Sequence, residues 1–85
     1  MSGRYGRLSS MQRALVKQAL GEMAERLETA RPDQPITEIG RIALIQATTM
    51  DPTLSGALRE RVPEITGSVI RREFAQQLRE IAGDA

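Results

Sequence analysis

Residues 9–30 read SSMQRALVKQALGEMAERLETA, a stretch in which apolar side chains recur at helical spacing. The intervals between them run 4-3-4-3, which is heptad spacing and predicts an amphipathic helix. Ser9 and Gln12 have the spacing of a capping box, so we expect the helix to begin at about residue 10 and to end at about residue 28. The members of the stripe are Val16, Leu20, Met23, Leu27 and Ala30.

Start and stop signals predict three more helices. ARPDQP (residues 30–35) ends the first helix, because each proline lacks a backbone donor and restricts the residue before it. A second helix is expected over residues 36–48, and Asp51-Pro52 is typical of an N-cap followed by the first residue of a third helix ending near residue 61. Residues 66–68 (TGS) then predict the cap of a fourth helix that ends near Gly83.

These signals predict an all-α fold: a compact bundle of about four helices with a short flexible basic N-terminal arm. We expect residues 1–8 to form that arm and residues 9–85 to form a single helical domain. The second helix is expected to be the most buried, because Glu38 and Arg41 are its only charges. One of its faces should hold Ile36, Ile39, Ala43, Ala47 and Met50, with Ile42 and Ile45 on the flank.

The small number of large apolar side chains affects which oligomeric state we expect. Aromatic residues make up 2% of the 85 residues, so the core must be built from smaller aliphatic side chains. This favours a homodimer that uses the first helix, alone or together with the second, with a seam at Val16, Leu20, Met23 and Leu27. The alternative is that the same stripe is the core face of a bundle within one chain.

The composition argues against catalysis. The sequence has no histidine and no cysteine, so the usual nucleophile–base pairs and soft metal ligands are missing. The carboxylates do not fall in the spacing of a calcium loop. We therefore expect no enzyme activity, no cofactor and no metal.

The apolar runs and the amino-acid usage of the sequence predict where the protein is located in the cell and what kind of genome encodes it. The longest strongly apolar run, IALI at residues 42–45, is too short for a membrane span or a secretory segment, which predicts a cytoplasmic protein. Lys17 is the only lysine among 12 basic residues, and asparagine is absent. That bias is typical of a GC-rich bacterial or phage genome.

Positive charge is concentrated at the start of the chain. Residues 1–21 hold four basic residues and no acidic one. A flexible segment with cations and a stacking ring suits a phosphate backbone, while the same charge also fits an acidic protein surface, an anionic membrane, or a tail that binds nothing. The candidate contact residues are Arg4, Tyr5, Arg7, Arg13 and Lys17.

Two functions are compatible with these features. The first is a small non-catalytic regulatory or adaptor protein that acts through protein–protein interaction with itself and with another protein. The second is a small DNA-binding transcriptional regulator with a helix-turn-helix-like unit at residues 53–82, in which Arg71 and Arg72 would contact DNA beside the basic arm. Pro63 in a long joint, and six acidic against five basic residues over 51–85, weigh against the second.

The capping box generates a prediction about the arm. Since Ser9 and Gln12 can start the first helix without upstream residues, deletion of residues 1–8 should leave the thermal unfolding midpoint of the protein unchanged. Circular dichroism of the full chain and of the deletion variant measures this. A midpoint lowered by many degrees would make the arm part of the folded domain.

Overall fold

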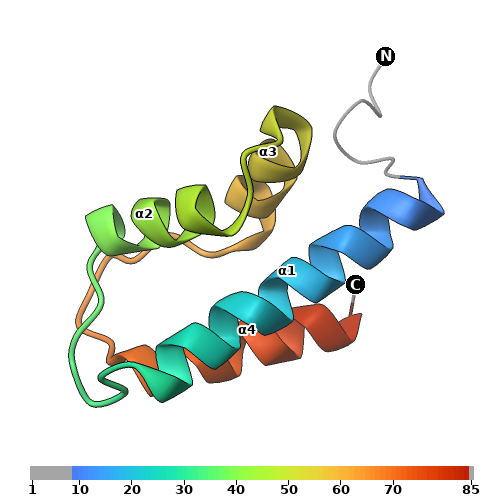
Figure 1. Ribbon diagram of the computed structural model, residues 1–85. Helices are drawn as coiled ribbons and strands as arrows, with labels where there is room; N and C mark the ends of the chain where they lie inside the picture. The colour runs from blue at the N-terminus through green and yellow to red at the C-terminus, as the bar shows by residue number, and fades with distance from the viewer. Residues whose placement is uncertain (1–8, 85) are drawn as a thin grey trace.

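The computed structural model describes residues 9–84, which form four α-helices (Figure 1). This confirms the predicted all-α bundle. The basic arm at residues 1–8 lies outside the described residues. Within residues 9–84, no helix has the length and apolar character needed to cross a lipid bilayer. The helices are α1 (Ser10–Thr29), α2 (Glu38–Thr48), α3 (Pro52–Arg61) and α4 (Arg71–Asp84).

The predicted capping box starts α1. The Gln12 amide donates to Ser9 Oγ at 3.1 Å, and the Ser9 amide donates to Gln12 Oε1 at 2.9 Å. The helix ends where Arg31 takes the left-handed conformation with φ 52°, directly before Pro32. A left-handed residue just past the last turn is a common helix terminator, and the proline prevents the helix from resuming.

Side-chain caps also fix the starts of α2 and α3. Asp51 accepts from the Thr53 amide at 3.0 Å and Pro52 is the first helical residue, as predicted. Thr37 caps α2 by accepting from the Gly40 amide at 3.1 Å, so α2 begins two residues later than predicted. The reason is that the Ile36 amide is bonded to a carbonyl in the chain before α4, which keeps Ile36 out of the helix.

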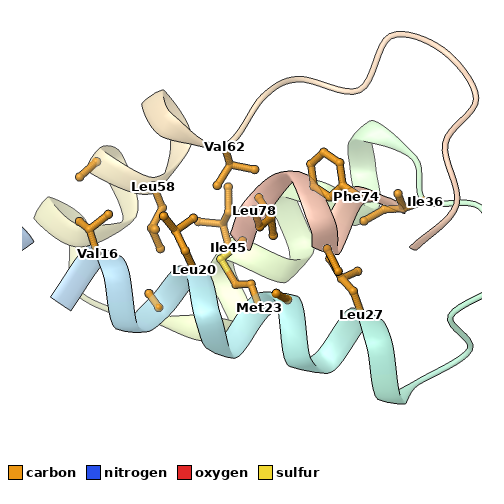
Figure 2. Packing of buried hydrophobic residues seen from close by; sticks show 14 residues of the cluster. Val16, Leu20, Met23, Leu27, Ile36, Ile45, Leu58, Val62, Phe74 and Leu78 are labelled. Carbon is orange, nitrogen blue, oxygen red and sulfur yellow. The ribbon is translucent and has the colours of Figure 1, made fainter. Parts of the chain in front are cut away.

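The core lies mainly between α1 and α4. These two helices run antiparallel side by side, and α2 and α3 also pack against α1 (Figure 1). In Figure 2, Leu27 of α1 lies near Phe74 of α4, and Met23 lies near Leu78. Helices α2 and α3 complete the core with Ile45, Leu58 and the adjoining Val62.

Two connecting segments pair with each other at one end of the bundle. The Ile36 amide donates to the Val69 carbonyl at 3.0 Å, and the Arg71 amide donates to the Gln34 carbonyl at 2.8 Å. This antiparallel pairing holds Val69 and Ile70 in extended backbone. The predicted cap at residues 66–68 is therefore wrong, and α4 begins only at Arg71.

A buried cation joins α2 to the segment between α3 and α4. The Arg41 side chain is almost wholly buried, and its Nη1 donates to the Val62 carbonyl at 3.0 Å. Its Nε and Nη2 donate to the Glu38 carboxylate at 2.7–3.0 Å. Glu38 also accepts from the Ile65 amide at 2.9 Å. The pair therefore holds one face of α2 against residues 62–65.

The Arg41–Glu38 pair predicts a pH dependence of stability. Hydrogen bonds from Arg41 and then from the Ile65 amide lower the pKa of the Glu38 carboxyl below its ordinary value. A lowered folded-state pKa stabilises the fold above the unfolded value of about 4.3, and this contribution is lost as the pH falls through the folded value. Glu38→Gln should therefore be less stable than wild type at pH 7, and the gap should close in acid.

Urea unfolding of both proteins from pH 7 to pH 3 measures this gap. Glu80→Gln is the matched control, because it removes a carboxylate that is exposed on α4. A gap between wild type and Glu38→Gln that stays constant with pH would show that the Glu38 charge does not stabilise the fold.

Candidate interaction surfaces

The outward face of α2 is apolar, contrary to the prediction that α2 is the most buried helix. Ile39 is 80% exposed and Met50, just past the helix end, is 96% exposed. Ala43 and Ala47 lie between them and are also exposed. Gln46 is the only polar side chain on this exposed face, which we call the α2 outer face: Ile39, Ala43, Gln46, Ala47 and Met50.

The Arg41–Glu38 pair explains why this face is outward. Both charges of α2 are turned toward residues 62–65, and on that inner side Ile45 is the fully buried aliphatic residue. A helix of 11 residues cannot bury both sides against one neighbouring layer. Burial of Arg41, with Glu38 half-buried beside it, therefore leaves the uncharged side of α2 in solvent. Helix α4 by contrast exposes Glu73, Gln76 and Glu80.

A second exposed apolar site lies where α1 begins beside α3. Met11 is 74% exposed and Leu15 is partly exposed on α1. Leu15 borders a shallow hollow of about 20 Å³, which is the room of a single water and far below a small-molecule site of about 300 Å³. The hollow is lined by Gln12, Leu15, Val16, Asp51, Thr53, Leu54 and Ala57.

The predicted dimer seam is not a surface. Val16, Leu20, Met23 and Leu27 are each at most 1% exposed in the single chain, where they pack against the other three helices (Figure 2). In the structure the heptad stripe is instead the core face of a bundle within one chain. The sequence could not distinguish the two arrangements, because a core face and a dimer seam have the same spacing.

The two arginines assigned to DNA contact bond to groups at or just after the end of α1. Arg71 Nε donates to the Ala30 carbonyl at 2.8 Å, and Arg72 forms an ion pair with Asp33. Partial burial, and then the nearby charge of Arg31, lower the pKa of Arg71. Both side chains therefore fasten the start of α4 to the segment that follows α1.

The helix-turn-helix arrangement is also missing from residues 53–82. That motif joins its two helices by a turn of about three or four residues. Here α3 ends at Arg61 and α4 begins at Arg71, and the segment between them is bonded to α2 and to residues 34–36. Helix α4 packs along α1 rather than on α3.

The remaining predicted contact residues are divided between two places. Arg13 and Lys17 are exposed one turn apart on α1, as the prediction needs, while Arg4, Tyr5 and Arg7 lie outside the described residues. Within residues 9–84, no three acidic side chains are grouped to hold a metal ion, and every buried side-chain nitrogen or oxygen has a hydrogen-bond partner.

Comparisons with known protein families, with curated proteins and with solved structures found no match to this chain. The assignment of a function therefore depends on the surfaces alone. Sequence reasoning grouped four of the five residues of the α2 outer face but placed them in the core. The available signal was that Glu38 and Arg41, three residues apart, lie together on the opposite side of the helix.

The buried heptad stripe of α1 and the exposed α2 outer face should differ in how much they contribute to the free energy of unfolding of the single chain. Leu20→Ala should lower the free energy of unfolding by about 3 kcal/mol, because it leaves a cavity in the core. Ile39→Ala should change it by less than about 0.5 kcal/mol, because Ile39 is in solvent. Urea unfolding at low micromolar protein measures both, and equal losses would mean that the α2 outer face stabilises the single chain.

Proposed function

We propose that this protein is a small non-catalytic regulatory or adaptor protein that acts through protein–protein contact, with the α2 outer face as its contact surface. The observation that carries the proposal is the exposure of Ile39 on α2 and of Met50 just after it, while the two charges of α2 pair with each other on the opposite side of the helix. Single exposed apolar residues are ordinary on protein surfaces. A whole uncharged helix face is typical of a binding site.

The energetic argument supports a protein partner. Full burial of a side chain such as isoleucine or methionine contributes roughly 1.5–3 kcal/mol. Ile39 and Met50 stand at opposite ends of the face and leave the small Ala43 and Ala47 between them, so another helix can approach α2 closely. Nucleic acid would instead require cations, and this face has none.

Site-specific photo-cross-linking tests the proposal. A photoreactive amino acid at position 47 should yield covalent adducts with protein in the native cells, because this position lies on the α2 outer face. The same amino acid at position 76 is the matched control, since Gln76 is also exposed, on the polar side of α4. Mass spectrometry of the adducts identifies the partner, and equal yields at the two positions would refute the proposal.

A further inference from the structure

Three arginines lie at the end of the bundle where α1 ends and α4 begins (Figure 1). Arg71 Nε donates at 2.8 Å to the carbonyl of Ala30, which is the residue directly before Arg31. The Arg72 amide donates to the Pro32 carbonyl at 3.0 Å, so the start of α4 is fixed to the same segment. These bonds bring together three cations that are far apart in the sequence.

Acidic side chains neutralise one of the three arginines. Arg72 pairs with Asp33, which is the acidic residue of the segment between α1 and α2. Glu73 on α4 is two positions after Arg71, and side chains at that spacing do not face each other. Within residues 9–84, Arg31 and Arg71 belong to no ion pair. Their two positive charges therefore lack a counter-charge in the part of the chain that the structure describes.

The surroundings of Arg71 are unfavourable for a lone cation. Its side chain is half-buried, and the Ala30 carbonyl that it contacts carries no net charge. Burial, and then the charge of Arg31, lower the pKa of Arg71. A cation that is partly removed from water and stands beside a like charge is stabilised when an anion binds to both. Because the bond to Ala30 uses Nε, the two terminal nitrogens of Arg71 can donate to such an anion.

Arg31 occupies a position at which glycine is the common residue. It follows the last turn of α1 with φ 52°, a left-handed conformation that is costly for a residue with a Cβ atom. Among residues 9–84, Arg31 contributes its carbonyl to the fold, which accepts from the Gln34 amide at 3.1 Å. The guanidinium forms no hydrogen bond or ion pair there, so the end of α1 does not need it.

We propose that Arg31 and Arg71 form a binding site for a doubly charged phosphate group, with the Arg72–Asp33 pair at its edge. Two guanidinium groups match the charge of a phosphate dianion, whereas a carboxylate or a phosphodiester balances only one of them. The planar forks of arginine donate in parallel to phosphate oxygens. The positive end of the α4 dipole lies at Arg71 and adds to the attraction.

Side chains rather than backbone amides hold the ligand in this site. The first amides of α4 already donate to protein carbonyls, those of Gln34, Pro32 and Ile70. The site is open to solvent, so we expect a dissociation constant of about 1 mM for inorganic phosphate. It contains no residue of the α2 outer face. The inference therefore goes beyond the proposed function and does not depend on it.

Titration of the full chain with sodium phosphate tests the site. The titration is carried out at constant ionic strength, set with sodium chloride, and is followed by the NMR signals of the backbone amides. The signals of Arg31 and Arg71 should shift and saturate, whereas that of Arg59, an exposed arginine on α3, should not. Shifts of equal size at all three, or at none of them, would overturn the proposal.

Arg31→Gly separates binding from stability, because it removes a cation and relieves the left-handed backbone. Its thermal unfolding midpoint should be at least that of wild type, while phosphate binding should weaken at least about tenfold. Arg71→Gln keeps a donor for the Ala30 carbonyl but removes the charge, and should weaken binding similarly. Arg59→Ala is the matched control and should bind as wild type does. Wild-type phosphate binding by Arg31→Gly, or a midpoint lowered by many degrees, would overturn the proposal.

Two sources of a phosphate dianion are distinguished with a short glycine-flanked phosphoserine peptide. Tighter binding of this peptide than of inorganic phosphate, lost in Arg31→Gly, would support the site and assign it to a phosphorylated partner protein. Equal binding of the two would support the site and assign it to free phosphate compounds. Equally tight binding of the unphosphorylated peptide, or of a thymidine oligonucleotide without terminal phosphates, would overturn the selectivity for a double charge.

These outcomes are independent of the photo-cross-linking at position 47. Loss of phosphate binding in Arg31→Gly leaves the α2 outer face intact, so the proposed function and this inference can fail separately.

Discussion

The buried guanidinium of Arg41 is the constraint on which the arrangement of this small bundle depends. A cation removed from water is costly unless it is paired and its donors are satisfied. Glu38 and the Val62 carbonyl meet that requirement, and they come from α2 itself and from the end of α3. The pair therefore sets the rotation of α2 about its own axis as well as its position.

The exposed face of α2 follows from that rotation. With Arg41 buried and Glu38 bonded to the Ile65 amide, Ile39, Ala43 and Ala47 face solvent, because they lie on the opposite side of the helix. In α2 the Arg41 cation is therefore buried and its Glu38 partner half-buried, while an uncharged surface faces solvent. The other helices keep the ordinary pattern, with Leu20 and Leu78 buried in the core.

Three further arginines also bond to groups of the same chain. Arg71 and Arg72 secure the segment after α1 to the start of α4, and Arg79 pairs with Glu28 at 2.6 Å to join α4 to α1. Exposed pairs of this kind contribute little stability each. Their effect is to fix where the connecting segments lie; the Arg71 side chain is partly buried by its contact, whereas Arg72 stays exposed.

The sequence by itself determined the helices, because their signals are local. Ser9 with Gln12, Asp51 with Pro52, and the heptad stripe each act within one or two turns, and the structure has the ends that they predict. Only the tertiary structure decided the start of α4 and the orientation of α2. The first depends on the bond between Ile36 and Val69, 33 positions apart. The second depends on the long-range bonds of Arg41 and Glu38 to residues 62 and 65, because α2 has apolar residues on all sides and no local pattern specifies which side faces the core.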